Sequence, residues 1–329
     1  MSNIDSSLRA FWLPGLNAVS GKVFKGLGGW IADEEYQVFS PLRQDSFTLS
    51  LSAPDQLLFA IAADVNRCAI ASFESINAVI KNNVLPRSTA WLVIKSYYAA
   101  FFGAHAIARM LGIGFLQFER THANSVNKIA DLFEMSNNVT VMRGYYEYSY
   151  NAEKKQIMFN RAKAESGGVH EIFWGIFYSL IRKLSDEVIF SVTSSPPNNH
   201  QVSVKLNELA DNLSHSSMAR GNWLSTIRNS VNYSHRLGTW FPYGEQRSHF
   251  VNLYNNRDKW LNDPMSIDLT CHADNDLLRF QATCSFIISL CRVLVSDMAT
   301  RNSGKKSFHE YGSIALLNLT GHGKHRVGA

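Results

Sequence analysis

Residues 91–111 read WLVIKSYYAAFFGAHAIARML, and as a helix this stretch is apolar on nearly every side. A helix without a wide polar face is typical of the centre of a protein core. The helix is predicted to begin at Ser88 or Thr89, since hydroxyl side chains favour helix starts. Gly112 and Gly114 end it, because glycine favours helix ends. The sequence therefore predicts a central buried helix.

A second helix is predicted directly before this one. Ser52 supplies an N-cap, and Pro54 and Asp55 suit the first turn of a helix. The apolar residues that follow at helical spacing are Leu58, Ile61, Val65, Cys68, Ala69, Phe73, Ile76 and Ile80. The connection to the central helix is short, which favours an antiparallel helical hairpin.

The same periodicity predicts most of the remaining chain to be helical. The further predicted helices cover residues 122–134, 169–190, 204–213, 224–235 and 276–300. Residues 194–200 hold two prolines among serines and asparagines, which is typical of a linker between two parts of one fold. Residues 47–51 alternate as a strand would. The prediction is an all-α helical bundle.

Four regions are expected along the chain. Residues 1–50 are read as an irregular N-terminal extension, and residues 51–302 as the helical domain. Residues 115–165 form an insertion in that domain, and residues 303–329 a basic, glycine-containing tail. The insertion holds a cluster of tyrosines followed by two lysines: Tyr145, Tyr146, Tyr148, Tyr150, Lys154 and Lys155. In one interpretation the tyrosine rings stack on bases and the lysines bind phosphates. In the other, the segment is a half-buried hairpin.

Composition narrows the possible partners. The net charge of +5 favours a polyanionic partner without requiring one. Charged residues make up only 18% of the 329 residues, so apolar surface is left for a partner or for self-association. No secretory signal is visible, and the apolar run 286–295 is too short for a bilayer and contains Arg292. A cytoplasmic protein without membrane contact is expected.

The cysteines do not indicate a metal site. The chain has four, and none forms a CxxC pair. Cys284 and Cys291 lie in an apolar helical stretch and are expected to pack in the core. Cys271 and His272 lack a second ligand pair at a suitable distance. We therefore expect neither a metal nor another cofactor.

The best indication of function lies in residues 224–235, LSTIRNSVNYSH. On a helix, Arg228 and His235 would lie roughly 20° apart around the axis and ~10 Å apart along it. Asn229 follows the arginine directly, and Tyr233 and Arg236 are close by. A permanent cation beside a titratable imidazole suits work on a phosphate.

These features resemble the HEPN superfamily (higher eukaryotes and prokaryotes nucleotide-binding). Its hallmark is an arginine followed by four to six residues and then a histidine, and here six residues separate Arg228 from His235. The aromatic stretch 97–102 also resembles the family. The likeness covers residues 52–112 and 168–300, leaving the first 50 residues, the insertion and the tail outside it.

The resemblance implies a helical bundle that is commonly a homodimer, with two motifs facing each other across a cleft. Many such proteins are metal-independent RNA endonucleases that act as toxins or anti-phage effectors. Some of them are restrained by an antitoxin or a regulatory partner protein. RNA would be the substrate here. His235 would transfer protons, Arg228 would stabilise the transition-state charge and Asn229 would orient the arginine or the phosphate. Tyr233 and Arg236 are weaker candidates for substrate contact.

Three other interpretations remain open. Arg228 and His235 could be structural, bonded to backbone or to a carboxylate. The chain could be a non-catalytic module of the same fold that binds a nucleotide, an RNA or a protein. It could also be one subunit of a larger assembly and need its partner for activity.

Overall fold

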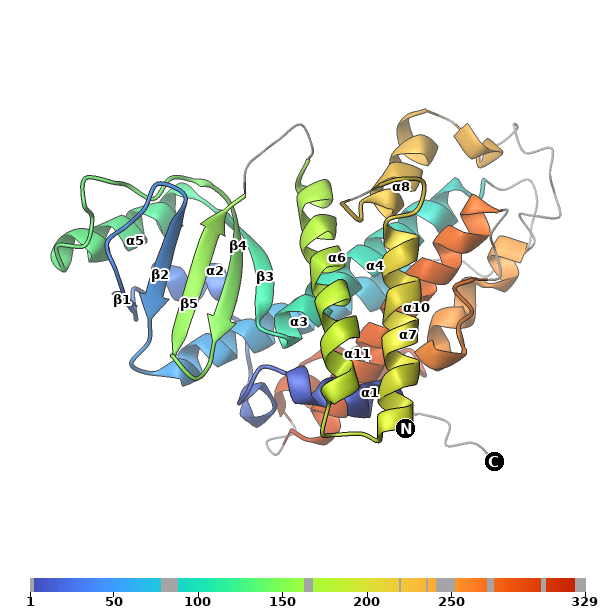
Figure 1. The fold of residues 1–329 in the computed structure, drawn as a ribbon, viewed down its shortest axis with the longest axis horizontal. Coiled ribbons are helices and arrows are strands. Elements are labelled where there is room, and N and C mark those ends of the chain that lie inside the picture. The colour runs from blue at the N-terminus through green and yellow to red at the C-terminus, as the bar shows by residue number, and fades with distance from the viewer. Residues whose placement is uncertain are drawn as a thin grey trace.

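The computed structural model describes most of the chain as a five-stranded sheet joined to a larger body of helices (Figure 1). The residues that it describes are 3–77, 88–162, 168–218, 220–234, 236–240, 252–270, 275–302 and 306–322. In Figure 1 the sheet stands at the left end of the molecule and the long helices fill the centre and the right.

The main elements follow in chain order. The helices are α1 (Asn3–Leu8), α2 (Leu27–Ala32), α3 (Pro54–Asn77), α4 (Ala90–Met110), α5 (Arg120–Leu132), α6 (Val169–Glu187), α7 (Pro196–Leu213), α8 (Trp223–Tyr233), α10 (Asp276–Thr300) and α11 (Ser313–Leu319). The strands are β1 (Gln37–Val38), β2 (Ser46–Ser50), β3 (Ile113–Phe118), β4 (Gly144–Asn151) and β5 (Gln156–Arg161).

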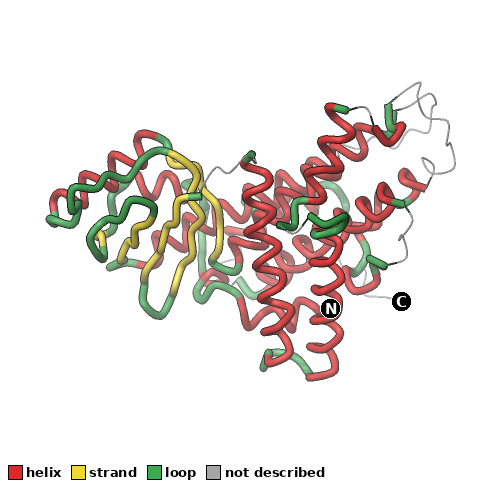
Figure 2. Tube along the Cα trace, turned by 45° about the horizontal axis from the view of Figure 1, so that its top comes forward, coloured by secondary structure: helices red, strands yellow, loops and turns green. Residues whose placement is uncertain are grey.

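The prediction of an all-α fold is wrong, because the chain is mixed α/β with an antiparallel sheet in the order β1-β2-β5-β4-β3. The sheet forms one layer beside the helices (Figure 2). Strand β2 confirms the strand predicted at residues 47–51. Strands β4 and β5 and most of β3 come from the predicted insertion, and β1 and β2 from the predicted N-terminal extension. Both regions are therefore parts of one sheet.

Alternating aromatic side chains explain why these residues form strands. Residues two apart in a strand share a face, and one face of this sheet is buried. Phe47 pairs with Phe159 across β2 and β5, their ring centres 4.9 Å apart, and Phe159 pairs with Tyr148 on β4. A side chain at Gly114 on β3 would overlap the Tyr148 ring. Gly114 therefore makes room for Tyr148 instead of ending a helix.

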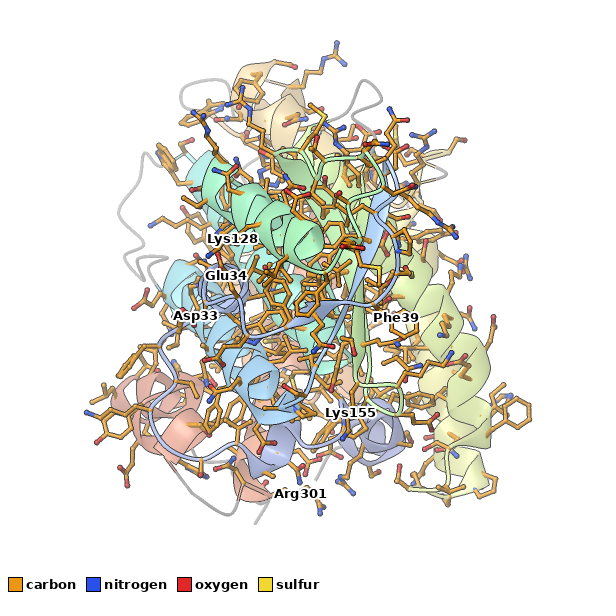
Figure 3. The ribbon with its side chains drawn as sticks, turned by 90° about the vertical axis from the view of Figure 1, so that its left-hand side faces the viewer. Asp33, Glu34, Phe39, Lys128, Lys155 and Arg301 are labelled. Carbon is orange, nitrogen blue, oxygen red and sulfur yellow. The ribbon has the colours of Figure 1, made fainter. Side chains whose placement is uncertain are left out.

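Two helices, α2 and α5, pack beside the sheet. Helices α2 and α5 contact each other, and both contact β3. The Lys128 ammonium on α5 lies 2.6 Å from the carboxylate of Glu34, which follows α2, and the two side chains are labelled side by side in Figure 3. An ion pair at the surface such as this one contributes little stability.

The central helix is where the sequence places it. Helix α4 packs against α3 and α10, and 17 of its residues are buried. The α10 bounds confirm the predicted range 276–300, and Cys284 and Cys291 are buried in it as expected. Helices α3 and α10 are long and apolar enough to cross a membrane, yet most of each apolar stretch is buried inside the protein. Core helices of this kind pass the same test.

The predicted linker at residues 194–200 is mostly helix. Pro196 and Pro197 occupy the first turn of α7, after Ser195 at the N-cap position. Proline is tolerated there because the first amides of a helix have no acceptor within it. Helices α6 and α7 therefore form a tight antiparallel pair, which stands in front of α4 in Figure 1.

A buried arginine joins the helices to the sheet. Arg109 on α4 is only 4% exposed and donates to the carbonyl of Phe115 on β3 at 3.0 Å. Its Nε lies 4.0 Å from the carboxylate of Asp64 on α3. It also donates to Nδ1 of His105 at 2.8 Å, and His105 stacks on Phe173 with ring centres 3.4 Å apart. His105 is therefore a core residue with a local hydrogen bond.

Candidate functional site

The candidate site is built on α8, whose apolar stripe packs against α4. Leu224, Ile227 and Val231 are buried, as their helical spacing predicts. The helix ends at Tyr233, with Ser234 at the C-cap position. The predicted helix through residue 235 is thus too long.

The predicted site residues do not all face the same way. Arg228 is 6% exposed, whereas Asn229, Tyr233 and Arg236 are exposed. Asn229 follows Arg228 by one helical step, which turns its side chain by ~100° toward solvent. His235, the predicted proton-transfer group, lies outside the described residues. The structure therefore separates the arginine from the three exposed candidates.

Arg228 lies over two aromatic rings of α4. Its guanidinium carbon is 5.0 Å from the ring centre of Tyr97 and 5.9 Å from that of Tyr98. Such cation–π contacts offset part of the free energy lost when a charge leaves water. Among the residues that the structure describes, no carboxylate lies within ion-pair distance of Arg228, and its buried Nε–H has no acceptor. The charge of Arg228 is therefore not neutralised by the described part of the protein.

The hydroxyl of Tyr97 is the centre of a hydrogen-bond network. The indole Nε1–H of Trp174 donates to it at 3.0 Å, and Arg228 and Ser225 also hydrogen-bond with it. A tyrosine hydroxyl donates one hydrogen bond and accepts two, so these groups share its bonding capacity with Nδ1 of His170, 3.0 Å away. The Tyr97 hydroxyl therefore links α4 to α6 and α8.

His170 is a residue that sequence reasoning missed. It lies in the first turn of α6, half-buried, with its ring centre 4.4 Å from that of Phe101 and 6.0 Å from that of Tyr98. Burial, and next the charge of Arg228, lower the pKa of His170 to about 4. The imidazole is therefore neutral at neutral pH. The only signal in the sequence is a polar residue near the start of the predicted helix 169–190.

The arrangement has the chemistry of an anion site. A fixed cation, a neutral imidazole and two tyrosines come together from α4, α6 and α8. Guanidinium binds phosphate oxygens through two parallel hydrogen bonds. In the described part of the chain, no group of three or more His, Cys, Asp or Glu side chains is placed to hold a metal ion. The sequence-predicted pair Cys271 and His272 lies outside the described residues.

We expect His170 to titrate with a pKa of about 4 instead of 6.5. In the Arg228→Met variant this pKa should rise, because the neighbouring positive charge is gone while burial remains. Since the unfolded chain binds a proton below about pH 6.5 and the folded chain does not, stability falls as the pH drops from 6.5 to 4. NMR titration of the imidazole carbon-bound protons measures the pKa directly. An ordinary pKa that is the same in both proteins would contradict the geometry.

Comparison with known proteins finds no relative. No family model matches the chain, and no curated protein or solved structure matches it.

Proposed function

We propose that the chain is a metal-independent RNA endonuclease in which Arg228 holds the phosphate at the cut. The main support is its buried guanidinium, which lacks a carboxylate partner among the described residues. A buried and unpaired charge is costly. An arriving anion would relieve that cost, so the site favours phosphate over a neutral ligand. The net charge of +5 also favours a polyanionic ligand such as RNA.

RNA supplies its own nucleophile for this reaction. A base removes the proton of the 2′-hydroxyl, whose oxygen attacks the neighbouring phosphorus. The bond from phosphorus to the 5′-oxygen breaks, and an acid protonates that leaving oxygen. The products are a 2′,3′-cyclic phosphate and a free 5′-hydroxyl. Arg228 would stabilise the charge on the phosphate oxygens, and His235, which follows the end of α8 in the sequence, would transfer a proton.

One histidine serves one proton transfer at a time. A homodimer would bring a second copy of the motif, as the HEPN resemblance implies, and the two imidazoles would share the acid and base roles. We include in the proposal that the enzyme acts as a toxin or anti-phage effector, restrained by an antitoxin or a regulatory protein. Asn229, Tyr233 and Arg236 stay candidates for substrate contact because all three are exposed near the end of α8.

A second candidate function is a non-catalytic module that binds RNA, a nucleotide or a protein. The observation in its favour is that Arg228 is only 6% exposed and is already engaged with the Tyr97 hydroxyl. A guanidinium in that position is well placed to hold α8 on α4. This role requires no substrate at the arginine.

Purified protein incubated with total RNA and EDTA is expected to produce fragments with 2′,3′-cyclic phosphate ends. His235→Ala should lower the cleavage rate by roughly 10²- to 10⁴-fold, since general acid–base catalysis contributes about that much. His200→Ala is the matched control, because His200 is exposed on α7. A 2′,3′-cyclic phosphate end resists a phosphatase that is specific for phosphomonoesters. Acid opens the cyclic phosphate, and the end then becomes sensitive to that phosphatase.

The two candidate functions give different results. Wild-type cleavage that His235→Ala removes and His200→Ala retains supports the nuclease. Full cleavage by His235→Ala rejects the assignment of that residue. If the wild-type protein and the His235→Ala variant both bind RNA and neither cleaves it, the non-catalytic module is supported. Toxicity on expression in a host, relieved by His235→Ala, tests the proposed biological role.

A further inference from the structure

The central helix α4 is buried on every side except one. All of its residues are buried apart from four that form the α4 stripe: Trp91, Lys95, Tyr98 and Phe102. Their spacing of four, three and four residues places them within about 60° on one face of the helix. Trp91 is 58% exposed and the other three are half-buried. The helix at the centre of the core therefore presents three aromatic rings and one cation on a single outer face.

The α4 stripe runs beside the helix that carries Arg228. The guanidinium carbon of Arg228 lies 5.9 Å from the ring centre of Tyr98. At the start of α4, the rings of Trp91 and Trp240 meet edge to face with their centres 5.7 Å apart. The indole Nε1–H of Trp240 donates to the carbonyl of Val231 on α8 at 2.7 Å. The stripe therefore extends from the candidate site to the end of α8, and the two helices are neighbours in Figure 1.

The charges along the α4 stripe are complementary to a polyanion. Helices α4 and α8 contain no aspartate or glutamate. Lys95 lies within the stripe, Arg228 borders it, and Arg236 is exposed just after α8. Glu171 in the first turn of α6 reduces this positive charge, since the neighbouring His170 ring lies 6.0 Å from that of Tyr98. Three cations and one carboxylate leave a positive balance, which attracts phosphates.

Aromatic rings interleaved with cations suit a single strand of nucleic acid. Each ring stacks on a base whatever the sequence, and each cation neutralises a phosphate. From Trp91 to Phe102 the stripe is ~16 Å long, which spans roughly four to five stacked nucleotides. An apolar protein surface would also cover the rings, but it would take the charge of Lys95 out of water at a cost in free energy. The stripe therefore favours a nucleic acid over an apolar protein partner.

We propose that the α4 stripe binds single-stranded RNA, with Trp91 stacking on a base and Lys95 contacting a phosphate. This inference rests on the proposed function for its ligand, RNA, but the binding itself does not require cleavage. Trp91 lies ~10 Å from Tyr98 along the helix, so its base belongs to a nucleotide away from the one held at Arg228. Trp91 and Lys95 are therefore substrate-binding residues that lie outside the motif at residues 228–235.

The test uses the full chain and a fluorescein-labelled 2′-O-methyl oligouridylate, which has no free 2′-hydroxyl and cannot be cut by the proposed route. Fluorescence anisotropy gives its Kd. Trp91→Ala should weaken binding about tenfold, an effect in the range of one stacked base. Trp91→Phe should recover most of the affinity, because it keeps an aromatic ring. Phe190→Ala is the matched control, since Phe190 is an 81% exposed ring just after the far end of α6.

The role of Lys95 is tested by the salt dependence of the same binding. Each phosphate contact to a single strand contributes about 0.7 to the slope of log K against log salt concentration. Lys95→Gln should therefore flatten the slope by about 0.7, whereas Trp91→Ala should weaken binding without changing the slope. Lys183→Gln removes an exposed lysine at the far end of α6 and should leave both the Kd and the slope unchanged.

Three results would overturn the proposal. The first is a Trp91→Ala variant that binds the oligonucleotide as the wild type does, or no more weakly than Phe190→Ala. The second is an equal change of slope in Lys95→Gln and Lys183→Gln, which would show a non-specific charge effect. The third is a wild-type dimer that Trp91→Ala converts to a monomer in analytical ultracentrifugation, which would show that a second copy of the chain covers the stripe.

The nuclease and the α4 stripe fail in distinguishable ways. Oligonucleotide binding that depends on Trp91, without cleavage of RNA by any preparation, rejects the nuclease and retains the stripe as an RNA-binding surface. RNA cleavage whose KM and kcat are unchanged by Trp91→Ala retains the nuclease and rejects the stripe.

Discussion

Arg228→Ala is expected to lower the rate of RNA cleavage by roughly 10³-fold, the loss typical when a donor to transition-state charge is removed. Arg228→Lys should recover little of that rate, because an ammonium cannot make two parallel hydrogen bonds to a phosphate. Initial rates on a labelled RNA, measured in EDTA, give both values. Arg120→Ala is the control, since Arg120 is an exposed arginine on α5 beside the sheet.

The same arginine should contribute little to stability. Arg228→Met removes cation–π contacts worth about 2 kcal/mol at a desolvated site, but it also removes the cost of burying an unpaired charge. These two effects oppose each other, so the free energy of unfolding should change by less than about 1 kcal/mol. Urea denaturation measures it. A loss of several kcal/mol together with normal cleavage would show that Arg228 holds the fold and has no catalytic role.

Arg109→Met should have the opposite consequence, with a loss of about 3–5 kcal/mol of stability, because removing one partner of a buried ion pair leaves the other charge uncompensated. Among the described residues, Asp64 on α3 would keep the exposed Arg67 and the amide of Leu27 as partners. The carbonyl of Phe115 on β3 would also lose its donor.

The control for this prediction is Arg67→Ala. Arg67 meets the same carboxylate at 3.1 Å but its side chain is 71% exposed, so its removal should cost no more than about 1 kcal/mol. Urea unfolding of both variants at one pH makes the comparison. Equal losses would mean that Asp64 depends on Arg67 as much as on Arg109, contrary to their burial.

The helices were predictable because their information is local. Helices α3, α4 and α10 repeat apolar residues at helical spacing over 20 residues or more, and the structure forms them near the expected bounds. The strands carry a weaker signal. In β5 the buried Ile157 and Phe159 flank the apolar but exposed Met158, which hides the alternation. Pairing then joins β2 to β5 across more than a hundred residues, and no local pattern encodes that.

The site was predictable in part for the same reason. Arg228 stands out because its neighbours on one helix form a motif, and the structure does bury it on the apolar side of α8. His170 meets it only because α4, α6 and α8 pack together around the Tyr97 hydroxyl. The spacing of residues in the sequence does not predict that His170 and Arg228 lie close together. The exposed position of Asn229 follows from a helical step of one residue, and the motif pattern does not take that step into account.

The place of β2 inside the sheet has a consequence for dissecting the molecule. Strand β2 lies between β1 and β5, so the first fifty residues cover the backbone of β5 along its whole length. A shortened polypeptide starting at α3 would leave that row of amides and carbonyls open. Unprotected edges of this kind recruit strands from other molecules. Removing the first fifty residues from the rest of the chain would therefore invite aggregation.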